Sequence, residues 1–168
     1  AAYRKTVLPT LAEIAGLEGR YWKDEGQKLQ AEGKTQQAEA SFKNALEAYK
    51  AAMAVDEVRV NVYMADNVGQ LHLMLGDIPA AKEVYKRIRV ALESVTGATE
   101  NIWSLATRAN AALVLEPDDN EALTYLARIR EFEPTDDNKT SICRGLELVK
   151  KALNKTDADY GRWVAVLG

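Results

Sequence analysis

A pattern of small and large residues recurs four times along this 168-residue chain, at intervals of 43, 41 and 39 residues. It appears when the predicted turns at Gly33, Gly76, Pro117 and Thr156 are superposed. A small residue stands five positions after each turn, and in the first three repeats a large apolar residue stands nine positions after it. The small residues are Ala38, Ala81, Ala122 and Gly161, and the large ones are Phe42, Tyr85 and Leu126. A period near 40 residues is typical of stacked supersecondary units.

The units themselves are predicted to be helical. Apolar residues recur at helical spacing along almost the whole chain, and the alternation typical of strands is nearly absent. Residues that end or begin helices interrupt this spacing. The predicted breaks are Gly33-Lys34, Val55-Asp56, Gly76-Asp77, Thr96-Gly97, Glu116-Pro117-Asp118, Pro134-Thr135-Asp136 and Thr156-Asp157. We therefore expect an all-α chain of about eight helices, paired as antiparallel hairpins in which the small residue allows close approach.

The first repeat has the form Trp22-x3-Gly26-x2-Leu29-x3-Gly33-x4-Ala38-x3-Phe42-x2-Ala45, which resembles the tetratricopeptide repeat signature. The second repeat matches it at Gly69, Gly76, Ala81 and Tyr85, and the third keeps Ala106, Ala122 and Leu126 but not the glycines. The resemblance implies a right-handed superhelical stack of helix hairpins with a concave groove. The units are longer than the family's usual length of about 34 residues.

These observations predict two parts. Residues 1–16 are expected to form an N-terminal arm with a short helix, broken near Gly16 and Gly19, that caps the end of the stack. Residues 17–168 are expected to form the repeat domain, with units at about 17–56, 57–97, 98–134 and 135–168. The chain begins Ala1-Ala2 without an initiator Met, so we expect a soluble chain that either lost a targeting peptide or was trimmed.

Composition argues against several classes of function. The net charge is −3 and the pI is about 5.3, which disfavours binding to nucleic acid through phosphate contacts. The chain has one Cys and one His, so neither a disulfide framework nor a Cys/His metal site is expected. No apolar run approaches the roughly 20 residues that span a bilayer. We therefore expect no cofactor, no metal and no membrane span.

Few residues are candidates for chemistry. His72 occupies the repeat position held elsewhere by Leu29 and Leu113, so it is predicted to be a packing residue rather than an acid or base. Cys143 lies in a helix with apolar periodicity and is predicted to be a buried thiol. The acidic pairs Asp118-Asp119, Asp136-Asp137 and Asp157-x-Asp159 each stand where a helix begins, which favours capping over metal binding. The chain is therefore not expected to be an enzyme.

The resemblance instead places a binding site in the groove, on the first helix of each hairpin. The residues that it implies as the lining are Arg20, Lys23 and Gln27, then Tyr63, Asp66, Gln70, Leu73 and Met74, then Thr107, Ala111 and Val114. Family members that bind chaperone C-termini use Lys, Asn and Arg at these positions. Here only Lys23 and Asn67 match, so that mode is not expected. The lining suits a helix or an extended segment of a protein partner, unless residues 160–167 of the chain itself cover it.

We therefore expect a non-enzymatic adaptor or scaffold that binds a partner segment in its groove, in the assembly of a larger complex. The alternative is a permanent structural subunit of a large multiprotein complex, in an organelle if a targeting peptide was removed. Apolar patches that stay uncovered in the isolated chain would favour this alternative.

Overall fold

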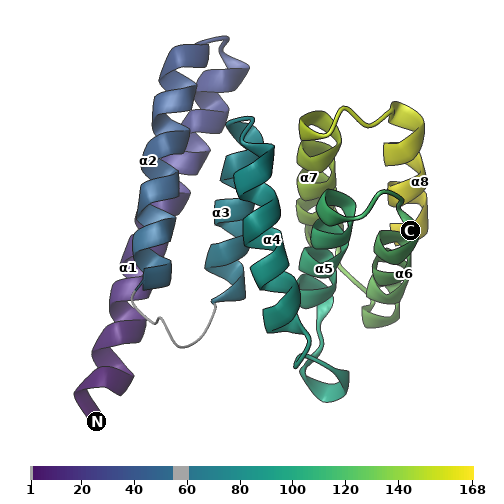
Figure 1. Ribbon diagram of the computed structural model, residues 1–168, viewed down its shortest axis with the longest axis horizontal. Coiled ribbons are helices and arrows are strands. Elements are labelled where there is room, and N and C mark those ends of the chain that lie inside the picture. The colour runs from purple at the N-terminus through teal and green to yellow at the C-terminus, as the bar shows by residue number, and fades with distance from the viewer. Residues whose placement is uncertain (1, 55–60) are drawn as a thin grey trace. The chain divides into compact units, whose positions relative to one another are not determined.

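A computed structural model describes residues 2–54 and 61–168 (Figure 1). Within these residues the protein is all-α, with eight α-helices, two short 3₁₀ turns and no strand. This confirms the predicted all-α class and the expected number of about eight helices. The predicted break at Val55-Asp56 lies outside the described residues. The chain divides into two compact units, Ala1–Asp77 and Ile78–Gly168.

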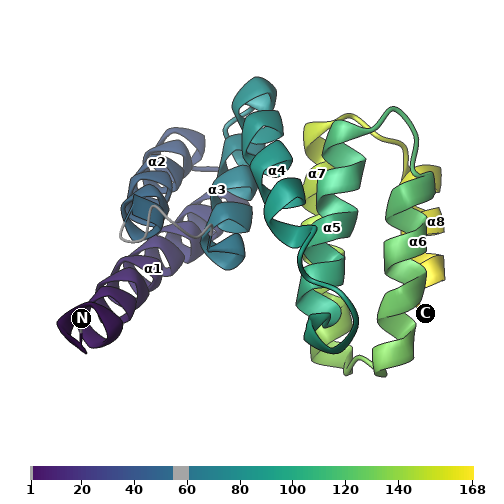
Figure 2. The ribbon, with the colours of Figure 1, turned by 60° about the horizontal axis from the view of Figure 1, so that its bottom comes forward.

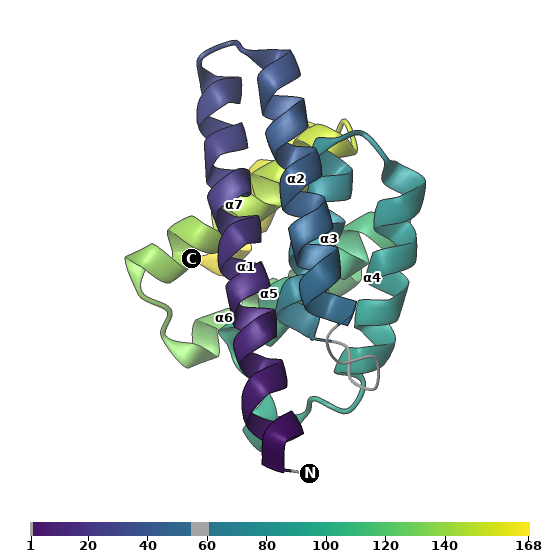
Figure 3. The same ribbon diagram turned by 90° about the vertical axis from the view of Figure 1, so that its left-hand side faces the viewer.

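The N-terminal unit is built from three helices: α1 (Ala2–Ala31), α2 (Thr35–Ala54) and α3 (Val62–Met74). The helices α1 and α2 form a long antiparallel hairpin, and α3 packs against α2 (Figure 3). The core of the hairpin is the face of α2 that carries Ala38, Phe42, Ala45 and Tyr49, all of which are buried. These four residues recur at intervals of three or four, so that they share one side of the helix.

Glycines on α1 let the two helices approach closely. A Cβ atom added at Gly26 would lie 2.5 Å from Cε1 of Phe42, and one at Gly19 would lie 2.7 Å from Cδ2 of Tyr49. Real Cβ atoms do not come so close to a ring, so the aromatic residues of α2 occupy the space that these glycines leave. The predicted break near Gly16 and Gly19 is therefore wrong: α1 continues through both residues.

The C-terminal unit contains α4 (Ile78–Leu92), α5 (Ile102–Leu115), α6 (Asn120–Ile129), α7 (Asp136–Ala152) and α8 (Asp157–Leu167), with 3₁₀ turns at Gly97–Thr99 and Arg130–Phe132. The helix α5 packs against α4, α6 and α7, and α8 packs against both α6 and α7. Figure 2 shows α7 beside α5 and α8 beside α6. Because three helices surround α5, nine of its fourteen residues are buried.

Two arginines connect α4 to the elements that follow it. Arg89 on α4 pairs with Glu116 and Glu121, at the end of α5 and the start of α6. Arg108 on α5 reaches back to the carboxyl end of α4, where it donates to the carbonyl oxygens of Leu92 and Val95. Carbonyl groups at a helix end have no partner within the helix, and Arg108 supplies hydrogen-bond donors to them. Its positive charge is also favoured at the carboxyl end of a helix.

Three of the turns share one hydrogen-bonding pattern. At Gly33 the amide of Gly33 bonds the carbonyl of Gln30, and the amide of Lys34 bonds that of Leu29. The same pair of bonds recurs at Gly76 and at Asn154, and all three residues have a positive φ. This is the Schellman motif, whose left-handed residue is usually glycine. The turns at Gly33 and Gly76 were predicted as helix ends on this basis, and their positions are confirmed.

The predicted helix starts after Pro134 and at Thr156 are also confirmed, with one refinement. The caps are Thr135 and Thr156, whose side chains accept from the amides of Asn138 and Asp159 in capping boxes. The acidic residues Asp136, Asp137 and Asp157 lie in the first turn, where a carboxylate opposes the helix dipole. By contrast, the side chain of Asp119 makes no cap hydrogen bond at the start of α6.

The repeat is visible in burial for three of its four copies. Ala38, Ala81 and Ala122 are all buried, and so are the large residues Phe42, Tyr85 and Leu126. In the fourth copy, Gly161 is exposed with open space around it. The small residue at that position therefore serves no close helix approach, although α8 is a helix as predicted.

Candidate functional site

A polar network joins α1 to α3 in the N-terminal unit. The amine of Lys23 on α1 donates to Oδ1 of Asn67 at 2.9 Å and to Oε1 of Gln70 at 2.7 Å, both on α3. Asn67 in turn donates to the carbonyl oxygen of Tyr63 at 3.0 Å, and Gln70 donates to Oδ2 of Asp66 at 2.8 Å. Three residues of the predicted lining, Lys23, Gln70 and Asp66, are thus joined by hydrogen bonds, and Asn67 connects Lys23 to the backbone of Tyr63.

The charge of Lys23 is compensated within this network. Burial lowers the pKa of Lys23, and the carboxylates of Asp66 and Asp24 act against that decrease. The amine of a lysine has three donors, and two of them are used by side-chain amide oxygens. The network is therefore suited to holding α1 against α3, and it leaves little capacity for a bound anion at Lys23.

Exposed groups surround the network. Arg20 and Gln27 on α1 are exposed, and the side chain of Tyr63 at the start of α3 is 57% exposed. Burial raises the pKa of the buried Tyr49, and the neighbouring Tyr63 contributes to this increase. Tyr63 thus lies near a buried residue of α2 and keeps an accessible ring. We call Arg20, Lys23, Gln27, Tyr63, Asp66 and Gln70 the α1–α3 surface.

The rest of the predicted lining is buried, apart from the half-buried Met74. Leu73 is buried and Met74 is half-buried at the end of α3. On α5, Thr107, Ala111 and Val114 are all buried. A partner segment has no access to the four buried residues in this structure, and Met74 is only partly accessible, so most of the accessible part of the predicted lining is the α1–α3 surface.

His72 is half-buried near the end of α3, and its Nδ1 lies 3.6 Å from Oδ2 of Asp77. Burial lowers the pKa of His72, with a smaller effect in the same direction from Lys50, and Asp77 opposes both. The neutral imidazole is therefore favoured at neutral pH. This environment is that of a packed residue near a helix end, as predicted.

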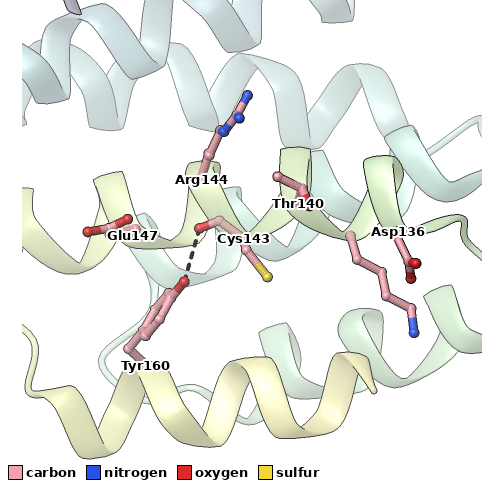
Figure 4. A pocket seen from close by; sticks show the side chains of 7 residues that line it. Asp136, Thr140, Cys143, Arg144, Glu147 and Tyr160 are labelled. Atoms are coloured by element: carbon pink, nitrogen blue, oxygen red, sulfur yellow. Dashed lines mark hydrogen bonds between the residues drawn. The ribbon is translucent and has the colours of Figure 1, made fainter.

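Cys143 lies at the surface of the C-terminal unit rather than in its core. It is half-buried and lines a pocket of about 370 Å³ between α7 and α8, together with Asp136, Lys139, Thr140, Arg144, Glu147 and Tyr160. In Figure 4 the Tyr160 side chain points from α8 toward the carbonyl oxygen of Cys143, to which its hydroxyl donates at 3.5 Å. Burial raises the pKa of the Cys143 thiol, which disfavours the reactive thiolate. The thiol was predicted to be buried, and it is only half-buried, because it lines this pocket.

Asp119 has a structural role that the sequence did not indicate, because the sequence predicted it only as a helix cap. Its side chain is buried and accepts from Nε1 of Trp163 at 2.7 Å and from Arg162 at 2.8 Å, while Lys155 lies 3.4 Å away. Burial by itself would raise the pKa of Asp119, but these three partners together lower it. Asp119 stands at the N-cap position of α6, but its side chain makes no capping hydrogen bond there. Its bonds to Trp163 and Arg162 instead hold α8 against the start of α6.

The structure also exposes a line of large apolar side chains on α1, which we call the α1 stripe. It consists of Leu11, Ile14, Leu17 and Tyr21, which are 49%, 57%, 64% and 62% exposed. Their spacing of three, three and four residues places them along one side of the helix. This side lies opposite the glycines that contact α2, so the stripe faces away from the core of the unit.

Comparisons of the chain with protein families, with curated proteins and with solved structures find no match. Among the described residues, no group of three or more His, Cys, Asp or Glu side chains is arranged to hold a metal ion. None of the described helices combines the length and the apolar character needed to cross a bilayer.

Proposed function

We propose that the protein is a non-enzymatic adaptor of the tetratricopeptide kind, with its hairpins stacked as a right-handed superhelix, and that it binds a segment of a protein partner on the α1–α3 surface. The support is the resemblance of the repeats, the all-helical fold and the burial of the repeat positions in three copies. The proposal confines the binding residues to the N-terminal unit, because those predicted on α5 are buried.

The observation that carries the proposal is the combination of a fixed support with exposed binding groups. The hydrogen bonds of Lys23 hold α1 and α3 in register, so that Arg20, Gln27 and Tyr63 are presented on a pre-organised surface. Exposed Tyr and Arg side chains on a rigid support are typical of the residues that dominate binding energy. The surface suits a segment that offers an apolar residue to the Tyr63 ring and carbonyl or carboxylate oxygens to Arg20.

Site-specific photo-crosslinking in the native extract tests this proposal. A photoreactive phenylalanine analogue at position 63 is expected to give a discrete adduct with one protein. The same analogue at position 103 serves as the matched control, because Trp103 is 51% exposed but lies in the C-terminal unit. In parallel, Tyr63→Ala is expected to reduce capture of that protein about tenfold or more, as for a central aromatic contact.

A further variant separates loss of binding from loss of local structure. Tyr63→Phe keeps the exposed ring and removes only the hydroxyl, so we expect it to retain most of the binding. Equal adducts from positions 63 and 103, or capture that Tyr63→Ala leaves unchanged in a folded variant, would show that the partner does not use this surface.

The alternative function, a permanent structural subunit, is favoured by one specific observation. The α1 stripe exposes four large apolar side chains, and such patches are a feature of surfaces that another chain covers. If this alternative holds, the protein would be recovered from the native extract only inside a large complex, and the isolated chain would aggregate.

A further inference from the structure

The charged residues beside the α1 stripe are arranged in a way that favours one kind of neighbour. Ile14, Leu17 and Tyr21 are spaced as in the seam of a two-helix coiled coil, where apolar residues alternate at intervals of three and four. Glu13 and Arg20, both exposed, lie along one edge of this seam, seven residues apart. Leu11 and Glu18 lie along the opposite edge.

Two copies of α1 that pair in antiparallel orientation would match these charges. When Ile14 of one copy packs against Leu17 of the other, the geometry of antiparallel helices brings Glu13 beside Arg20 of the second copy. The two-fold symmetry forms this contact twice. A parallel pair would instead place Glu13 beside Glu18 of the second copy, which is repulsive, and Arg20 beside Glu25, which is attractive. The charge contacts of a parallel pair therefore cancel, whereas those of the antiparallel pair are attractive. The charge pattern thus selects both a self-complementary partner and its orientation.

We propose that the α1 stripe is a self-association surface, on which a second copy of this chain packs its own α1 in antiparallel orientation. The contact removes Ile14, Leu17 and Tyr21 from water and is bordered by two Glu13–Arg20 ion pairs. Because the stripe extends over only three turns of helix, the association is weaker than that of a standard-sized interface and depends on protein concentration. Arg20 borders both the stripe and the α1–α3 surface, whereas Leu17 and Glu13 belong to the stripe side alone, so Leu17→Glu and Glu13→Arg test self-association without changing a residue of the α1–α3 surface.

Sedimentation equilibrium of the full chain over a wide concentration range tests the proposal. The wild-type chain is expected to show a monomer–dimer equilibrium, and Leu17→Glu is expected to abolish the dimer. Glu13→Arg brings two guanidinium groups together in both contacts, and the dissociation constant is expected to rise about tenfold. The double variant Glu13→Arg/Arg20→Glu restores two opposite-charge contacts and should return the constant to near its original value.

A matched control is Arg87→Glu, which reverses an exposed charge on α4, outside the stripe, and should leave the dimer unchanged. The proposal is overturned by a chain that stays monomeric at all concentrations, which would leave the stripe to a different partner. It is also overturned by a dimer that tolerates Leu17→Glu, or by a double variant that associates no better than Glu13→Arg. If Leu17→Glu loses its helical circular dichroism, the charge-reversal series decides the question, because both charged residues are exposed.

Discussion

At the scale of single residues, Asp119 makes contacts across the C-terminal unit that its predicted role as a helix cap did not include. Trp163 and Arg162 on α8 and Lys155 before it all contact its carboxylate. A buried carboxylate is stable only where donors replace the water it has lost, and here an indole, a guanidinium and an amine do so. No local pattern indicates this role, because the partners lie 36 to 44 residues further along the chain.

We predict that Asp119→Asn destabilises the protein by about 1–2 kcal/mol, because the amide keeps an acceptor oxygen but loses the charge that its three partners complement. Urea denaturation followed by circular dichroism measures the change. Asp118→Asn is the matched control: Asp118 is exposed and accepts only from the amide of Asn120 among the bonds described, so its change should stay within about 0.5 kcal/mol. Equal effects of the two substitutions would mean that Asp119 does not hold α8.

The same residue predicts how stability depends on pH. The pKa of Asp119 in the folded protein lies below its ordinary value of 3.8, so the folded state favours the carboxylate. Its stabilisation is therefore complete above pH 3.8 and is lost as the pH falls through the lowered folded value. In Asp119→Asn this part of the acid sensitivity should be absent, so the difference in unfolding free energy between the two proteins should shrink below about pH 4.

At the scale of elements, the ends of helices were more predictable than what lies between them. The turns at Gly33 and Gly76 and the caps at Thr135 and Thr156 depend on hydrogen bonds between residues three to five positions apart. Such local chemistry is readable in a sequence. The continuity of α1 could not be predicted, because a glycine such as Gly19 can either end a helix or allow a neighbour to approach. The second role applies here, because the Tyr49 ring packs against Gly19.

Two glycines separate these roles experimentally. Glycine to alanine inside a helix normally stabilises by roughly 0.5–1 kcal/mol, and we expect this for Gly161→Ala, since a Cβ atom there meets nothing within 4 Å. Gly26→Ala should instead destabilise by about 1–3 kcal/mol, because the methyl group would overlap the Phe42 ring. Thermal unfolding of the two variants should therefore shift in opposite directions. A stabilised Gly26→Ala would show that α1 and α2 are less tightly packed than described.

At the scale of the whole molecule, the all-α class and the number of helices could be predicted, whereas the accessible surface could not. Helical periodicity and the repeat identify which residues of a helix face inward, but not how many neighbours it has. Thr107, Ala111 and Val114 were assigned to an open groove, and they are buried on a helix that α4, α6 and α7 all contact. In the same way, Lys23 and Gln70 were assigned to one lining only because of the repeat resemblance. The hydrogen bond between them could be seen only in the structure.

Self-association has a consequence for the stability of the entire chain. Because the folded state alone can form the antiparallel pair, unfolding competes with dimerisation, and the midpoint of thermal unfolding should rise with protein concentration. We expect an increase of about 1–3 °C for each tenfold rise above the dissociation constant. Leu17→Glu should remove this dependence. A midpoint that is independent of concentration in the wild-type chain would contradict self-association on α1.

The close packing of Gly26 on Phe42 also limits the order in which substitutions can accumulate at these two positions. A smaller residue at position 42 opens space, after which a side chain at position 26 is tolerated. The reverse order passes through a protein whose hairpin is overfilled and unstable. The same holds for Gly19 and Tyr49. The two helices of the first hairpin therefore accept substitutions as linked pairs, with the aromatic partner changing first.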